Sequence, residues 1–167
     1  MGKKLRIGWF TFTCCEDSSI VFLELMNRHY FEWKKLLDFR YCTMLKSKNV
    51  LDEMDVAFVE GAISNEKEKK RLLEIRSRCK YLVAIGACAC TGLPSGQRKD
   101  FPERLKRKIA PFIRKWNMYP EVLKLEDVVK VDDRVAGCPM VEQTFLAVLN
   151  RYLDEFGVAK DDAQAKL

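Results

Sequence analysis

The chain has 167 residues, of which 48% are hydrophobic and 32% are charged, and its formal net charge is +6. This balance is typical of a globular protein and excludes a disordered or fibrous chain, and no apolar run is long enough to cross a membrane. We expect one domain over 1–157 and a flexible tail over 158–167. Seven cysteines without an apolar leader predict a cytoplasmic protein whose cysteines are ligands rather than disulfides.

The first half of the chain alternates between short apolar runs and helical periodicity. Residues 5–12 predict a buried strand, and the polar turn after it offers Asp17, Ser18 and Ser19 as caps of a helix. Apolar residues at helical spacing continue that helix over about 20–39.

Three more strands are expected over 39–45, 55–59 and 80–85. Between the last two of these, Ser64 is a candidate N-cap for a charged helix that runs to Cys79.

The second half begins with prolines and glycines and then becomes regular again. We expect a basic helix over 103–116, a strand within 128–137 (VVKVDDRVAG) and an amphipathic helix over 141–156. Strands that alternate with helices indicate parallel βαβ units, so the predicted fold is α/β, with an open parallel sheet as the middle of three layers.

Much of the positive charge lies in 98–115, which has eight Lys or Arg residues against two acids. A solvated helix face is the first interpretation, and an acidic protein partner is the second. Nucleic acid is disfavoured because the segment has neither interleaved aromatic residues nor a nucleic-acid-binding motif.

Four cysteines follow predicted strands, each in a short polar or glycine-marked turn: Cys14, Cys15, Cys88 and Cys138. The carboxyl ends of parallel strands lie along one edge of an open sheet, where ligands bind. Thiolates that are distant in sequence are therefore expected to converge there. Four converging thiolates are what an iron–sulfur cluster requires.

The same residues allow other interpretations. Taken singly, each cysteine is equally consistent with a small buried hydrophobic residue that has no ligand role. Zinc also takes four thiolates, but structural zinc sites usually show close C-x₂₋₄-C pairs. Cys42 and Cys79 are expected in the core, whereas Cys90 could replace Cys88 as a ligand or point behind the loop. The only histidine, His29, is expected to pack in the core rather than act as a base.

Three stretches of the chain resemble a known protein family. The stretches DVAFVEGAISNEKE and LLEIRSRCKYLVAIGACACTG, and the GCP at 137–139, resemble nickel–iron hydrogenase small subunits and the complex I subunit of about 20 kDa. The resemblance spans about 5–155 and implies a flavodoxin-like fold that holds one proximal 4Fe–4S cluster. Cys88 and Cys138 match the family's ligands, and VEGAI, with Glu60, is closest to cytosolic hydrogenases.

The first ligand pair follows the complex I pattern instead. Complex I subunits use adjacent cysteines, as in Cys14-Cys15, whereas hydrogenases use C-x-x-C, whose second cysteine would stand at Ser18. This difference leaves open whether the partner large subunit holds nickel and iron. The chain has no cysteine-rich extension after about 157, so one cluster is expected.

The resemblance implies a non-catalytic electron-transfer subunit of a hydrogenase-type oxidoreductase. Its expected partners are a large subunit and a further electron-carrier subunit. Thr13, Glu16 and Glu60 could line the cluster loops, with the acids either solvated or relaying protons. Two rival functions are a structural or assembly protein of the same fold and a quinone-coupled complex I-type subunit whose basic 98–115 segment faces anionic lipid.

Overall fold

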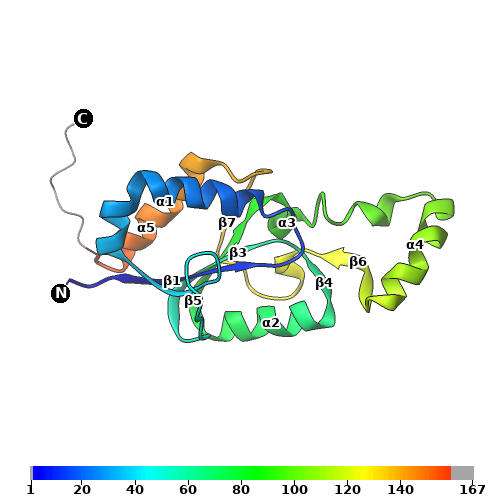
Figure 1. The fold of residues 1–167 in the computed structure, drawn as a ribbon, viewed down its shortest axis with the longest axis horizontal. Helices are drawn as coiled ribbons and strands as arrows, with labels where there is room; N and C mark the ends of the chain where they lie inside the picture. Colours follow the sequence, from blue (N-terminus) through cyan, green and yellow to red (C-terminus); the bar gives the residue numbers. More distant parts are fainter. Residues whose placement is uncertain (1, 159–167) are drawn as a thin grey trace.

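The computed structural model describes residues 2–158 and is built around one five-stranded sheet (Figure 1). All neighbouring strands run parallel, in the order β2-β1-β3-β5-β7. The strands are β1 (Leu5–Thr11), β2 (Leu37–Cys42), β3 (Met54–Glu60), β5 (Cys79–Ile85) and β7 (Asp133–Val135). The predicted flavodoxin-like α/β fold is therefore confirmed.

Helices cover both faces of the sheet and make the three layers. The helices α1 (Asp17–Leu36) and α5 (Glu142–Glu155) lie on one face, and α2 (Glu66–Ser77) lies on the other (Figure 1). The larger core is aromatic: Trp9 stacks on Phe22 of α1 at 4.2 Å between ring centroids and meets the edge of Phe145 of α5 at 5.9 Å. The second core is mostly aliphatic, with Phe10 as its one buried aromatic residue among those described, and it packs α2 against the sheet.

Several element boundaries differ from the predictions. The helix α1 begins three residues earlier than expected and ends at Leu36, so β2 follows it directly. Within 128–137 only Asp133–Val135 is a strand, because the preceding apolar residues pack against the second core instead of pairing. The N-cap of α2 is Asn65, not Ser64: its side chain accepts a hydrogen bond from the Glu68 amide, while Ser64 remains in a strand.

The sequence patterns do not predict one short helix and two short strands. The short helix α3 (Gly86–Thr91) starts immediately after β5, and β4 (Ile63–Asn65) pairs antiparallel with β6 (Met118–Leu123). The predicted tail over 158–167 lies outside the described residues apart from Val158, which is buried in the larger core. The predicted extent of the domain remains a prediction.

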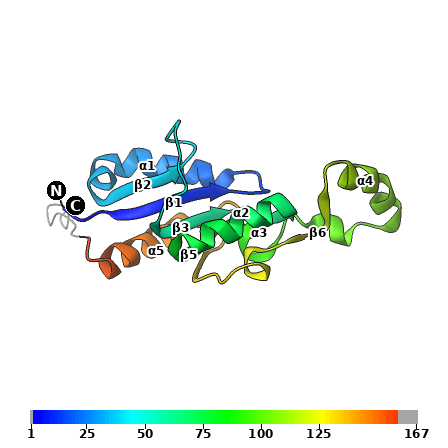
Figure 2. The same cartoon turned by 90° about the horizontal axis from the view of Figure 1, so that it is seen from below.

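An arm extends from the body of the molecule beyond α3 (Figures 1 and 2). It contains the 3₁₀ turn η1 (Gln97–Asp100), the helix α4 (Glu103–Lys115) and part of β6, and α4 has no buried residue. Three large apolar side chains on and just after this helix are 40–61% exposed, namely Leu105, Phe112 and Trp116. No helix within residues 2–158 is both long enough and apolar enough to span a membrane.

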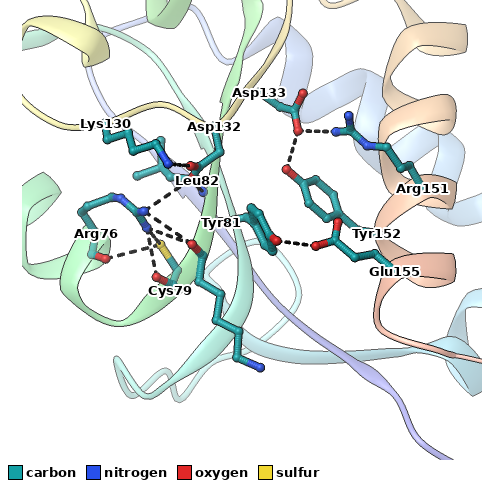
Figure 3. A network of polar contacts seen from close by, with 11 residues as sticks. Arg76, Cys79, Tyr81, Leu82, Lys130, Asp132, Asp133, Arg151, Tyr152 and Glu155 are labelled. Carbon is teal, nitrogen blue, oxygen red and sulfur yellow. Dashed lines mark hydrogen bonds and ion pairs between the residues drawn. The ribbon is translucent and has the colours of Figure 1, made fainter.

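The short strand β7 is held in place by two adjacent aspartates (Figure 3). Asp132 accepts a hydrogen bond from the Leu82 amide of β5 at 2.9 Å and pairs with Arg76 of α2 at 3.4 Å. Asp133 accepts a hydrogen bond from the Tyr152 hydroxyl of α5. The strand β7 has only three residues and therefore few hydrogen bonds of its own. The bonds from these two carboxylates to β5, α2 and α5 fix its position. The loop that follows β7 is positioned as a result.

A third aspartate makes the free energy of unfolding depend on pH in the acidic range. Asp55 of β3 accepts hydrogen bonds from Arg6 at 2.9 and 3.2 Å and pairs with Lys80 at 3.0 Å. Burial alone would raise the pKa of Asp55, but the bonds from Arg6 and Lys80 outweigh it and lower the pKa to about 2. Because the folded-state pKa lies below the unfolded value of about 4, the stabilisation is present above pH ~4 and is lost as the pH falls towards 2.

We therefore expect Asp55→Asn to lower the free energy of unfolding at pH 7 by about 1–2 kcal/mol and to flatten the loss of stability between pH 4 and 2. Chemical denaturation of the full chain at several pH values measures both effects. Asp100→Asn, a change at an exposed position in the arm, is the control and should leave the profile unchanged. An equally steep acid profile for Asp55→Asn would contradict the assignment.

Candidate iron–sulfur site

All four predicted cysteines line one small pocket at the carboxyl edge of the sheet. Cys14 and Cys15 stand in the loop between β1 and α1, Cys88 is in α3 after β5, and Cys138 follows β7. Topology alone brings them together, since parallel strands end at the same edge. The other residues that line the pocket are Asp17, Ser18, Glu60, Ile85, Gly86, Ala87, Gly137 and Pro139.

The pocket is closed on one side and open on the other. Cys88 is buried and Cys14 is partly buried, whereas Cys15 and Cys138 are exposed. Within residues 2–158, no three Cys, His, Asp or Glu side chains converge closely enough to hold a single metal ion. In a 4Fe–4S cluster each thiolate binds a different iron, so its ligands lie further apart.

The tandem cysteine loop is anchored by Glu60, the last residue of β3. Its carboxylate is buried and accepts hydrogen bonds from the Ser18 and Ser19 amides, both at 3.0 Å, and from the Ser19 hydroxyl at 2.7 Å. Free amides at a helix N-terminus favour a negative charge. The cap of α1 therefore comes from a distant strand, and the prediction that Asp17, Ser18 and Ser19 cap this helix by their own side chains is wrong.

Ser18 joins the tandem cysteine loop to the loop of Cys138. Its hydroxyl is buried and accepts a hydrogen bond from the Met140 amide, beyond Cys138, at 3.2 Å. The Ala87 amide in turn donates to the Gly137 carbonyl at 2.7 Å, which joins the loops of Cys88 and Cys138.

Two glycines permit this close approach. Gly86 has φ +78° and faces Ser18, whose Oγ would lie 2.9 Å from an added Cβ. Gly137 has φ +120°, and a Cβ there would lie 2.4 Å from the Pro139 carbonyl oxygen. Side chains at these positions would combine backbone strain with a clash. The glycines of the GAC and GCP sequences are therefore required by the shape of the pocket.

The electrostatics of the pocket fit a positively charged group. Burial, followed by the negative charge of Glu60, raises the pKa of Cys14 to about 12, and the protonated thiol donates to the Phe12 carbonyl at 3.5 Å. A thiolate at this position therefore needs a cation beside it. Iron ions supply such a charge, since metal binding deprotonates a coordinating thiol.

Of the three residues expected to line the cluster loops, only one lines the pocket. Glu60 lines the pocket, whereas Thr13 and Glu16 do not. The Thr13 hydroxyl turns away and bonds to Ser64 at 2.7 Å and to Glu68 at 3.0 Å. Thr13 therefore fixes the start of the cysteine loop, as Glu60 fixes its end.

The remaining cysteines lie outside the pocket. Cys42 is buried in the larger core as expected, and Cys79 is only partly buried. Cys90 points away from the pocket, with its Sγ 3.7 Å from the Ala84 carbonyl, and burial raises the pKa of its thiol. The core placement of His29 is wrong: its side chain is 35% exposed and stacks on Trp33 at the helix surface.

The family follows from comparison with known proteins. A model of the NADH ubiquinone oxidoreductase 20 kDa subunit matches residues 14–152. The chain belongs to this family.

Two curated relatives of the family are hydrogenase subunits. The delta subunit of sulfhydrogenase 2 from Pyrococcus furiosus is 28% identical over 87% of this chain and 60% of its own length. The delta subunit of the NAD-reducing hydrogenase HoxS from Cupriavidus necator is 24% identical over 88% of this chain and 78% of its own length. The chain thus spans about three fifths of the first relative.

Solved structures agree with the fold. A chain from an NAD⁺-reducing NiFe-hydrogenase in the H₂-reduced state superposes with a TM-score of 0.75, covering 99% of this chain and 98% of that one at 24% identity. A chain from the membrane-bound sulfane sulfur reductase, an archaeal respiratory membrane complex, superposes with a TM-score of 0.51. The match covers 92% of this chain and 73% of that one at 18% identity.

The cap on α1 can be tested without any cofactor. Glu60→Gln replaces one accepting oxygen with an amide that faces the helix amides, so we expect the free energy of unfolding to fall by about 2–3 kcal/mol. Equilibrium denaturation of the full chain measures this. Glu16→Gln changes an exposed acid in the same loop and should shift stability by less than ~0.5 kcal/mol. Equal effects of the two changes would show that Glu60 is not the cap.

Proposed function

We propose that the chain is the electron-transfer subunit of a cytoplasmic hydrogenase-type oxidoreductase and that it holds one 4Fe–4S cluster. Cys14, Cys15, Cys88 and Cys138 are the proposed ligands. One observation carries the proposal: cysteines from three separate strand ends line a single pocket. Membership of the 20 kDa subunit family, with hydrogenase subunits among the relatives, supports the same conclusion.

The residues around the pocket have defined tasks in this proposal. When bound, the cluster accepts and releases single electrons. Glu60 and Thr13 hold the two ends of the tandem cysteine loop, which fixes Cys14 and Cys15 before any metal arrives. Ile85 contributes an apolar wall beside the buried Cys88, and burial of this kind limits water around a cluster. In this proposal the chain's residues bind the cluster and do not make or break a bond in a substrate.

The partners follow from the exposed side of the pocket. Cys15 and Cys138 face solvent, so a partner subunit is needed to cover that side. We propose a large subunit that carries the catalytic site as one partner, and a further electron-carrier subunit as the other. The whole complex's substrates belong to those partners.

A second candidate is a quinone-coupled subunit of the complex I type. The adjacent Cys14 and Cys15 favour it, because the resemblance assigns tandem cysteines to complex I. Metal analysis of the intact complex distinguishes the two candidates. Nickel in the large subunit supports the hydrogenase-type assignment, whereas its absence together with quinone reductase activity supports the second candidate.

The cluster itself is tested by composition. Anaerobically purified full-length chain should contain about four irons and four acid-labile sulfides and give an EPR signal after dithionite reduction. A chain that stays free of iron after anaerobic reconstitution would instead be a structural or assembly protein of this fold.

The ligand assignment is tested by a matched pair of cysteines two residues apart. Cys88→Ser should remove most of the bound iron and the visible absorption, because a buried ligand is lost. Cys90→Ser is the control and should keep both, since its thiol points away from the pocket. Iron content and absorption per chain measure the outcome. Full iron retention in Cys88→Ser, and likewise in Cys138→Ser, would refute the ligand set.

A further inference from the structure

A serine that no motif indicated lies against one of the proposed ligands. Ser95 stands in the loop after α3 and is partly buried. Its Oγ is 3.1 Å from Cys88 Sγ and also 3.1 Å from the Thr13 carbonyl oxygen, to which it donates a hydrogen bond. The side chain therefore connects the loops of Cys88 and Cys14.

A serine hydroxyl has one proton, so it donates to only one of these two neighbours at a time. In the free thiol form Cys88 can donate to Ser95 while Ser95 donates to Thr13. A thiolate has no proton to give and accepts instead. A hydrogen bond to a charged acceptor is roughly twice as strong as a neutral one. The hydroxyl proton is therefore expected to turn to the sulfur once Cys88 is a thiolate.

Turning the hydroxyl leaves no buried group unsatisfied. The Thr13 carbonyl oxygen also accepts a hydrogen bond from the Ala62 amide at 3.0 Å, so it keeps a partner when Ser95 turns away. An orphaned buried carbonyl would have opposed the change by about 1–3 kcal/mol. The geometry removes this penalty.

No second hydroxyl shares this position. Among the described residues, Ser95 is the only hydroxyl-bearing side chain in hydrogen-bond contact with any of the four pocket sulfurs. The Ser18 hydroxyl, which also lines the pocket, accepts from the Met140 amide. The hydrogen bond from Ser95 is thus tied to one ligand.

We propose that Ser95 is a positioning residue that donates a hydrogen bond to the Cys88 thiolate and thereby raises the reduction potential of the cluster. The inference rests on the proposed function. Reduction by an external one-electron donor adds one negative charge to the cluster and its ligands. A hydrogen bond to ligand sulfur stabilises that charge more in the reduced state than in the oxidised one.

The test is an EPR-monitored redox titration of the reconstituted full chain, with three variants. Ser95→Ala removes the donor and should make the midpoint potential more negative. The expected change in the ratio of reduced to oxidised cluster is up to about tenfold, which is about 59 mV for one electron. Ser95→Thr keeps the hydroxyl and should restore the wild-type potential.

Thr91→Val is the matched control. The Thr91 hydroxyl bonds to the Ala87 carbonyl at 2.8 Å and to the Leu93 amide at 3.2 Å, in the same segment but with no contact to sulfur. Its loss should leave the potential unchanged. Electron–nuclear double resonance after exchange into D₂O gives an independent readout. The wild type should show an exchangeable proton coupling that Ser95→Ala lacks.

The outcomes separate this inference from the proposed function. A wild-type chain that binds no cluster would overturn both. A cluster present in Ser95→Ala with unchanged potential and couplings would overturn the inference alone. If Ser95→Ala fails to hold a cluster, Ser95→Thr decides: a cluster with the wild-type coupling supports the hydroxyl, and a similar loss shows that only packing is involved.

Discussion

The buried carboxylate of Glu60 is the interaction on which the rest of the site depends. A charge that is removed from water is tolerated only when it is fully hydrogen-bonded. Here the amides of Ser18 and Ser19 supply two donors and a hydroxyl supplies the third. Ser19 also accepts a hydrogen bond from the Trp9 indole at 2.9 Å. The end of β3, the start of α1 and the aromatic core are thereby joined, and the tandem cysteine loop is held between them.

The pocket therefore has its shape before any cofactor is present. Its three loops follow the parallel strands β1, β5 and β7 of one sheet and are bonded to one another through Ser18, Gly137 and their backbone partners. A preformed frame costs little ordering when a group binds. It also suits electron transfer, because a rigid site changes little between oxidation states. The exposed thiols of Cys15 and Cys138 are the part that this frame leaves open.

Strong local signals made the sheet and the cysteine edge predictable, and the remaining features depend on contacts between distant residues. Continuous apolar runs identified β1, β3 and β5, and the strand ends identified the four cysteines. The role of Glu60 as a cap could not be predicted, because its partners lie more than 40 residues away. Ser95 carries no motif, and its contact with Cys88 exists only because the loop after α3 folds back. The apolar residues before β7 resembled a strand because packing against a sheet and pairing within one use the same residue types.

The arm gives the molecule a lopsided charge distribution. Residues 98–115 have eight Lys or Arg residues and two acids, so this segment accounts for the whole formal charge of +6, and the remainder of the chain is balanced. In Figure 2 the arm extends well beyond the sheet. A positive end separated from a neutral body is a large electric dipole. Such a dipole rotates in the field of a negatively charged body during diffusion, so productive encounters become more frequent at low ionic strength and the advantage fades as salt shortens the Debye length.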